Sequence, residues 1–451
     1  MFDRRRLFVM IGLFVLSVIA LGTLTVLAQE PTEVKVWIAF TDDTRVGWSR
    51  DRATEFNEAH PEYNVVIETY ENYEAILEAT ILALEQGTAP AVVQWFEVGT
   101  QRARDLGYFK SIADALGDRT EVLGEPVNLD DFIEPVVSYY TLEGQFTSMP
   151  WNSSTPILYS NTAMLEAAGI EAPPATWQEL EAACAAIMAM DNAPEYCITW
   201  PNHGWFFEQW MAQQDALLAN NDNGRSARAT EVFLDSEAAI NIAEWWQNMY
   251  NQGYYYYSGV QRDWDATEQA IQTGQVAMVI TSSADARNIT TAAAENDINL
   301  VTTRMPYDGE VGWTGNLIGG ASLWLVDGLD PVVEDGALAF LLYFTNTENA
   351  ASWHQTTGYL PIRLSAVELL EEQGWFEENP NFFTASDQIN NTTVTPATRG
   401  ALLGTFPETR DIVTQAIEDL MLSGGDPAER MAQAKADADA LLADYNALYA
   451  E

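Results

Sequence analysis

Two polar side chains follow predicted strands at the points where those strands end. Tyr73 comes after the strand of residues 63–69, and Glu97 comes after the strand of residues 91–95. A phenol can donate or accept a hydrogen bond, and a carboxylate can accept bonds from two neighbouring hydroxyl groups. Helix-start packing is the commoner role for such a tyrosine, and a solvated loop or helix cap for such a glutamate. Their position at strand ends favours ligand contact.

Small residues stand at three further places where the chain turns. Ser154 lies in the Pro-containing stretch of residues 148–159, Ser282 ends the strand VAMVIT, and Gly320 precedes the strand of residues 321–326. The usual role of such residues is to permit a turn. The functional alternative for the glycine is that a residue without a side chain lets a ligand reach a main-chain N–H group.

Two candidate residues lie beside predicted helices in the last quarter of the chain. Tyr359 sits on a turn after a helix that stops at Gly358, and Arg410 begins a helix predicted from about residue 407 to residue 421. A cation in the first turn meets the positive end of the helix dipole, which disfavours it by about 0.3–1 kcal/mol. A nearby anion would explain Arg410, since a guanidinium binds phosphate through two parallel N–H bonds. The alternative is an ordinary surface arginine.

The elements that position these residues alternate between strand and helix. The sequence predicts strands at 34–40, 63–69 and 91–95, and helices at 43–57 and 73–85. This alternation predicts an α/β fold with a parallel sheet covered by helices on both faces. Ligands bind outside the carboxyl ends of the strands in such sheets. The aromatic stretch 200–215 suits a core better than a stacking wall for a ligand.

The chain of 451 residues is too long for one core and fits two lobes. We expect three crossovers between the lobes, at 148–159, at 276–304 with the return at 298–304, and at 315–363. Gly320 would then reach the cleft, and Tyr359 would lie in the second lobe. The predicted boundaries are 1–28 for a signal segment, 29–147 plus 285–325 for the first lobe, and 148–284 plus 326–451 for the second.

The N-terminus has the pattern of a secretory signal. Three arginines at 4–6 precede an apolar run at 7–27, and Val26-Leu27-Ala28 offers small residues for cleavage after Ala28. Uncleaved, the run approaches the length of a membrane anchor. No cysteine follows it, so a lipoprotein anchor is not indicated. We expect a location outside the cytoplasmic membrane, in the periplasm or beyond, with membrane association as the alternative.

The chain is strongly acidic, with a formal net charge of −45. Removing residues 1–28, which hold three Arg and one Asp, leaves −47. Such a surface repels nucleic acid and anionic lipid, so neither is expected as a partner. Solubility in an acidic or salty exterior explains the charge better than a specific cationic partner does. An anionic ligand would need a local positive site.

The cysteines and histidines exclude several kinds of site. Cys184 and Cys197 are the only cysteines, and their spacing permits either a helix-to-strand disulfide or two buried thiols. The histidines at 60, 203 and 354 are scattered and form no metal or triad pattern. Motifs of the GxSxG, HExxH and P-loop kinds are missing, which disfavours a secreted hydrolase. Without repeats, a surface adhesion protein is disfavoured too.

Several unbroken strings resemble extracellular solute-binding protein family 1, in its glycerol-3-phosphate-binding branch. They are IGGASLW and ENAAxWHQxTGYLPI within 315–363, YENY at 70–73, APAVVQWFEVGT at 89–100, WNSSTPILYSN at 151–161, and the stretches 174–180 and 399–410. The resemblance covers nearly the whole chain after residue 28. It implies a two-lobe periplasmic-binding-protein fold, similar to type II, with a cleft between the lobes.

The resemblance also implies roles for single residues. Tyr73 and Glu97 match positions that contact the glycerol hydroxyls. The positions that match phosphate contacts are Ser154, Ser282, Gly320, Tyr359 and Arg410. Much of 200–260 departs from the family, which leaves the pocket for a phosphate substituent open.

These matches imply the substrate-binding component of an ABC importer. It would be a monomer without cofactor or enzymatic activity that captures glycerol-3-phosphate or a related glycerophosphodiester by hinge closure. Its partners would be the transmembrane permease subunits, which work with a cytoplasmic ATPase. A neutral sugar or oligosaccharide is the alternative ligand.

Overall fold

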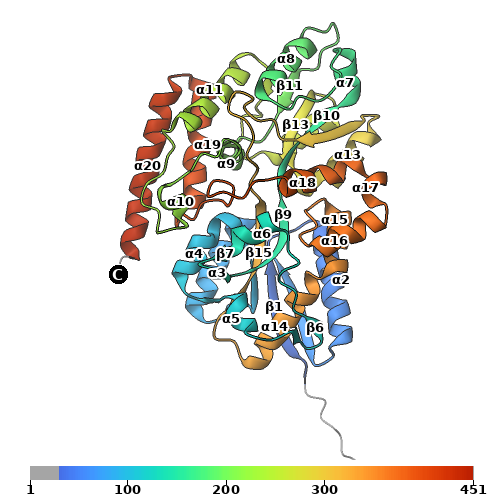
Figure 1. The fold of residues 1–451 in the computed structure, drawn as a ribbon, viewed down its shortest axis with the longest axis vertical. Helices are drawn as coiled ribbons and strands as arrows, with labels where there is room; N and C mark the ends of the chain where they lie inside the picture. Colours follow the sequence, from blue (N-terminus) through green and yellow to red (C-terminus); the bar gives the residue numbers. More distant parts are fainter. Residues whose placement is uncertain (1–29, 450–451) are drawn as a thin grey trace, which may run out of the picture.

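The computed structural model describes residues 30–449, which form two lobes, each built around one β-sheet (Figure 1). The first lobe, drawn low in Figure 1, holds the N-terminal strands, and the second holds the strands drawn in green and yellow. The predicted signal segment, residues 1–28, lies outside the described part. Within 30–449 no helix combines the length and the apolar character needed to cross a bilayer.

The sheet of the first lobe runs in the order β2-β1-β3-β15-β4, and β9 pairs with β15. Its strands are β1 (Thr32–Ile38), β2 (Tyr63–Thr69), β3 (Val92–Phe96), β4 (Phe109–Lys110), β9 (Met149–Ser154) and β15 (Gly319–Val326). The first three are parallel, as their alternation with helices predicts. All five residues of β3 are buried, as expected for a central strand covered on both faces.

The sheet of the second lobe runs in the order β12-β11-β13-β10-β14. Its strands are β10 (Pro156–Asn161), β11 (Tyr196–Thr199), β12 (Tyr255–Tyr256), β13 (Val276–Ser282) and β14 (Leu300–Arg304). Every residue of β10 and β13 is buried. Two small hairpins complete the strands, β5 (Glu121–Val122) with β6 (Glu125–Pro126) and β7 (Thr141–Leu142) with β8 (Gln145–Phe146).

The helices cover both sheets. In the first half they are α2 (Asp43–Ala59), α3 (Tyr73–Gln86), η1 (Glu97–Gly99), α4 (Thr100–Leu106), α5 (Ile112–Leu116), α6 (Glu134–Tyr140), α7 (Thr162–Ala167), α8 (Trp177–Met188), α9 (Gly204–Gln213) and α10 (Asn220–Gly224). The later ones are α11 (Glu237–Asn251), α12 (Trp264–Gln272), η2 (Ser283–Asp285), α13 (Ala286–Glu295), α14 (Pro331–Phe344), α15 (Thr347–Thr357), α16 (Leu364–Glu372), α17 (Trp375–Glu378), α18 (Pro380–Asn390), α19 (Phe406–Ser423) and α20 (Pro427–Leu448).

The chain passes between the lobes three times. The first passage is nearly direct, because only Thr155 separates β9 of one sheet from β10 of the other. The second leads from β14 to β15, and the third leads from α16 to α18, which packs on β10 and β14. Three passages between two α/β lobes confirm the predicted fold class.

The structure differs from the predicted lobe assignment at three places. Residues 298–304 do not return the chain to the first lobe, because β14 pairs with β10 in the second sheet. The segment after residue 326 does not enter the second lobe at once, because α14 packs on β1 and α2. Tyr359 also belongs to the first lobe, since its neighbour Leu360 donates its N–H to the carbonyl of Ser153 in β9.

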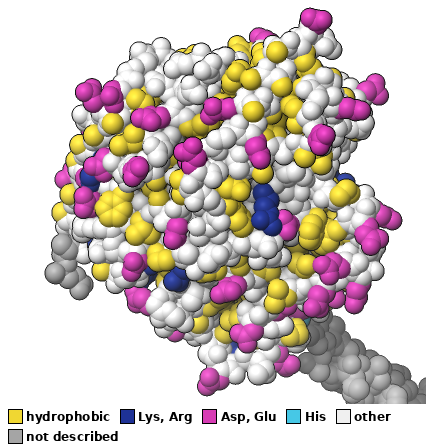
Figure 2. Space-filling view, turned by 45° about the horizontal axis from the view of Figure 1, so that its top comes forward, with side chains coloured by type: hydrophobic (Ala, Val, Ile, Leu, Met, Phe, Trp, Pro, Cys, Tyr) yellow, Lys and Arg dark blue, Asp and Glu magenta, His cyan; other side chains and the backbone are white. Residues whose placement is uncertain are grey.

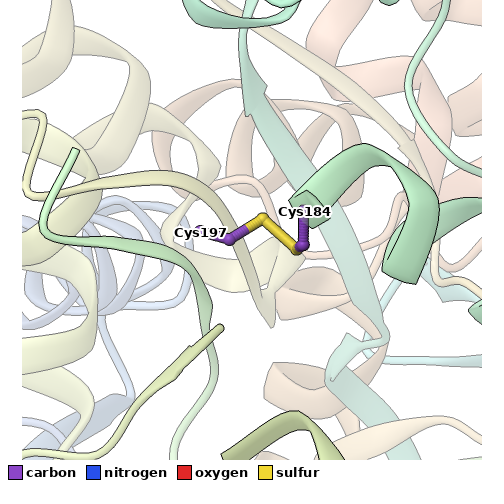
Figure 3. Close-up of a disulfide and its surroundings, with 2 residues drawn as sticks. All are labelled: Cys184 and Cys197. Carbon is purple, nitrogen blue, oxygen red and sulfur yellow. A yellow bond between two sulfur atoms is a disulfide. The ribbon is translucent and has the colours of Figure 1, made fainter. Parts of the chain in front are cut away.

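A disulfide joins Cys184 of α8 to Cys197 of β11 (Figure 3). Both residues are fully buried and belong to the same hydrophobic cluster as Trp177, Trp200 and Trp210. Of the two possibilities left open by the sequence, the structure shows the bonded one. A cross-link of this kind restricts the unfolded chain more than the folded one.

We expect the double variant Cys184→Ser with Cys197→Ser to lose about 2–4 kcal/mol of its free energy of unfolding, because the unfolded chain regains loop entropy. Urea denaturation of the purified protein measures the loss. Reduction of the natural chain is the control and should lower stability to the same extent. Equal stability of the natural, reduced and double-variant forms would contradict a structural role for the bond.

Candidate ligand-binding site

A cavity of about 650 Å³ lies between the lobes and is lined by residues of both. Its size is typical of small-molecule sites. All seven residues singled out in the sequence line it, namely Tyr73, Glu97, Ser154, Ser282, Gly320, Tyr359 and Arg410. It opens beyond the carboxyl ends of β1, β2 and β3, where the rule for parallel sheets places ligands.

Two tyrosines from the first lobe present hydroxyl groups to this cavity. Tyr73 begins α3, stacks on Phe96 with ring centroids 5.6 Å apart, and accepts a hydrogen bond of 2.7 Å from the Asn152 amide. Tyr359 stacks on Trp353 at 5.5 Å. Burial raises the pKa of both phenols, so each keeps its proton and can donate it to a ligand.

The small residues allow the backbone to come close to the cavity. Gly320 has a φ of +97°, and a Cβ there would lie 1.9 Å from the carbonyl oxygen of Asn152. Only glycine fits that approach. Ser154 ends β9 beside it. Ser282 ends β13, where its Oγ accepts the N–H of Ala284 at 3.1 Å and keeps its own hydrogen for another partner.

Arg410 lies in α19 and is held between two carboxylates. Its Nε and Nη2 donate to the two oxygens of Glu208 at 2.6 and 2.8 Å, and Nη2 also donates to Glu97 at 2.7 Å. Because α19 begins at Phe406, Arg410 is the fifth helical residue, so the prediction that it lies in the first turn is wrong. The anions beside this cation are carboxylates of the protein itself.

Burial and pairing oppose each other in this ion cluster. Burial raises the pKa of both Glu97 and Glu208, while the guanidinium beside them acts to lower it. Burial alone would lower the pKa of Arg410, but Glu208 and Glu97 more than offset this and raise it. The arginine therefore stays charged, and the carboxylates depend on it for their charge.

Further ion pairs cross the cleft at the rim of the cavity. Arg45 of α2 bonds Asp285 of the second lobe, and its guanidinium lies 5.6 Å from the ring centre of Tyr359. Arg262 of the second lobe lies 3.3 Å from Glu74 of α3. Together with the contact between Arg410 and Glu97, these pairs link the two lobes at three places around the cavity.

Three residues of the cavity region were missed as candidates. Trp205 and His203 line the cavity, whereas we assigned the aromatic stretch to the core. Core is correct for its neighbours Trp200 and Trp210, which are fully buried. Glu208 carried a usable signal, because it is the one acid in the run GWFFEQWMAQ, every residue of which is buried.

His203 acts as a neutral hydrogen-bond donor at the cavity wall. Its Nδ1 accepts the N–H of Trp205 at 2.9 Å, which puts the ring proton on Nε2. Burial lowers the pKa of His203 well below its usual value, and the nearby Arg410 and Arg262 lower it further. The ring therefore stays uncharged near neutral pH.

Acidic side chains outnumber basic ones both on the surface of the molecule and among the residues that line the cavity. Figure 2 shows Asp and Glu spread over the face in view, with few Lys or Arg among them. The charged residues that line the cavity are Asp42, Glu71, Glu74, Glu97, Asp285, Arg45, Arg262 and Arg410. Within the described part of the chain, no group of three or more His, Cys, Asp or Glu side chains is placed to hold a metal ion.

Comparison with known families decides the class of this protein. A sequence profile described as bacterial extracellular solute-binding protein matches residues 51–384. The chain belongs to this family. Among its relatives, the sn-glycerol-3-phosphate-binding periplasmic protein UgpB of Salmonella typhimurium is 34% identical over 388 residues, which cover 84% of this chain and 85% of the relative. UgpB of Yersinia pestis is 32% identical over 423 residues, 92% of this chain and 93% of the relative.

Solved structures of solute-binding proteins share the fold. UgpB from Mycobacterium tuberculosis in complex with glycerophosphocholine superposes with a TM-score of 0.76 at 20% identity, over 93% of this chain and all of that one. The sugar-binding protein MalE from Xanthomonas citri gives 0.75 at 19% identity, over 93% of this chain and 99% of that one. This solute-binding protein therefore has the two-lobe architecture predicted from its sequence.

We expect Gly320→Ala to destabilise the protein by about 3 kcal/mol or more, because it adds a backbone clash to the strain of a positive φ. The matched control is Gly328→Ala, where φ is +77° but a Cβ would meet no atom within 4 Å. That control should lose only about 1 kcal/mol from strain. Chemical denaturation compares the two, and equal losses would contradict the close approach at Gly320.

Proposed function

We propose that this protein captures glycerol-3-phosphate or a related glycerophosphodiester outside the cytoplasmic membrane and delivers it to an ABC importer. One observation carries the proposal. Seven residues that lie far apart in the sequence, and that match the ligand positions of the resembled family, line a single cavity between the lobes. Relatives above 30% identity include glycerol-3-phosphate-binding proteins, which supports the same ligand class.

The glycerol end of the ligand would lie against the first lobe. Glu97 can accept bonds from two vicinal hydroxyls through lone pairs that Arg410 leaves free, and the protonated Tyr73 can donate to one of them. Vicinal hydroxyls are the feature that glycerol-3-phosphate, its diesters and sugars share. This half of the site therefore recognises polyols and does not by itself select phosphate.

The phosphate would meet donors from both lobes. Ser154 and Ser282 offer hydroxyl hydrogens, and Tyr359 offers a phenolic hydrogen. Gly320 has no side chain between the backbone and the ligand. Arg410 supplies the charge. Neutral donors of this kind can bind an anion without adding net charge to the protein.

Ligand binding would favour the closed arrangement of the lobes. A ligand that touches both lobes stabilises the state in which both sets of contacts exist together. The closed shape would then be recognised by the permease subunits, with a cytoplasmic ATPase behind them. We propose a monomer without enzymatic activity, exported by means of residues 1–28.

The test is isothermal titration of the chain from Gln29 with glycerol-3-phosphate and with glycerophosphocholine. At least one should bind the natural protein. Arg410→Ala should weaken binding more than about 100-fold, because it removes the guanidinium that this proposal assigns to the phosphate. Arg430→Ala, which removes a surface charge paired with Asp419 in the same lobe, is the control and should bind normally.

A milder pair of variants separates binding from stability. Ser154→Ala should lose about tenfold or more in affinity, because a hydrogen bond to a charged group disappears. Ser160→Ala replaces a fully buried serine of β10 that does not line the cavity, so it should leave the affinity unchanged. If titration detects binding of a neutral disaccharide but of neither phosphate ligand, the phosphate proposal is overturned and a sugar is the favoured ligand.

A further inference from the structure

The hydrogen bonds of Arg410 determine what the guanidinium can still offer a ligand. Glu208 takes one hydrogen of Nε and one of Nη2, and Glu97 takes the other hydrogen of Nη2. Among the described residues, none bonds Nη1, so its two hydrogens remain. Arg410 therefore presents only Nη1 to the cavity, because Glu208 already binds Nε and Nη2 together.

Glu208 depends on Arg410 for its hydrogen bonds. Its side chain is 6% exposed, and Arg410 is its only hydrogen-bond partner within the described part of the chain. A ligand that displaced Glu208 from Arg410 would leave a buried carboxylate without a partner, which is strongly unfavourable. The ligand must therefore bind with Glu208 still in place.

The charge of the cluster is consequently negative. One guanidinium stands against two buried carboxylates, so with both carboxylates ionised Arg410, Glu97 and Glu208 together carry a net charge of minus one. Buried charges are screened little by salt. The other ionisable groups of the cavity add no free positive charge, because His203 is neutral. Arg262 is paired with Glu74 and Asp411, and Arg45 is paired with Asp285.

We infer that Glu208 is a specificity-determining residue, which makes the cavity select a phosphodiester over a phosphate monoester. This inference rests on the function proposed above. A monoester carries a charge close to minus two at neutral pH, whereas a diester carries minus one. Each unit of ligand charge is repelled by the excess carboxylate, so the monoester suffers about twice the penalty at the same contacts.

The cavity has room for the second substituent of a diester. Its volume of about 650 Å³ falls in the range that encloses ligands larger than glycerol-3-phosphate. Trp205 and Trp264 form part of its wall in the second lobe, with ring centroids 6.1 Å apart. A substituent attached to the phosphate can lie against these rings while the glycerol end stays with Tyr73 and Glu97 in the first lobe.

The experiment compares three ligands by isothermal titration, namely glycerol-3-phosphate, glycerophosphoglycerol and glycerophosphocholine. The natural protein should bind both diesters at least about tenfold more tightly than the monoester. Glu208→Gln, which keeps the size of the side chain and removes its charge, should shift this ratio toward the monoester by about tenfold. Glu208→Asp keeps the charge and should retain the preference for diesters.

Glu244→Gln is the matched control, since it removes one negative charge from an exposed position of α11 in the same lobe. It should leave all three affinities unchanged. The affinities of the natural protein for the three ligands can be compared without any variant. This comparison therefore still tests the predicted preference for diesters if Glu208→Gln does not fold. Circular dichroism identifies that case.

Each result has one meaning for the inference. Monoester binding as tight as diester binding overturns the role of Glu208 and leaves the proposed function standing. A preference for glycerophosphocholine alone also overturns it, because the cationic choline group would then be the cause. Binding of none of the three ligands overturns the proposed function and this inference with it.

Discussion

The buried guanidinium of Arg410 is the interaction on which the cleft depends. A charge removed from water needs partners of opposite sign and good geometry, or it destabilises the fold by several kcal/mol. Here the arginine lies on α19, and its partners come from two other segments, α9 and the short η1 at the end of β3. Since η1 belongs to the first lobe and the two helices to the second, neutralising one arginine also aligns the lobes.

Much of the fold follows from local rules of sequence. Three strands alternate with helices, their apolar runs bury the sheet, and Asn72 caps α3 so that Tyr73 starts at the sheet edge. The seven candidate residues were found because glycines, strand ends and helix starts leave local signals and because long strings resemble one family. Their convergence on one cavity is a matter of topology, which local signals do not encode.

The errors have physical causes as well. The strand β14 is short and half-buried, so its sequence fits the edge of either sheet, and only pairing with β10 assigns it. Glu208 was overlooked because an acid in an aromatic helix has no local partner. The arginine that justifies it lies 202 residues further along the chain. Arg410 itself was recognised, but the anion inferred beside it came from the protein.

The acidity of the whole molecule and the acidity of the site act on different scales. Exposed charges are screened beyond about 8 Å at physiological ionic strength, so the formal charge of −45 is hardly felt inside the cleft. Buried groups escape that screening. Glu208 converts the neutral pair of Arg410 and Glu97 into a negative cluster. In the proposed function this buried charge would act on a bound phosphate more strongly than the many surface carboxylates do. A protein of this charge could bind an anion if most of its donors are neutral hydroxyls, as proposed above, and Glu208 would then limit how much negative charge that anion can carry.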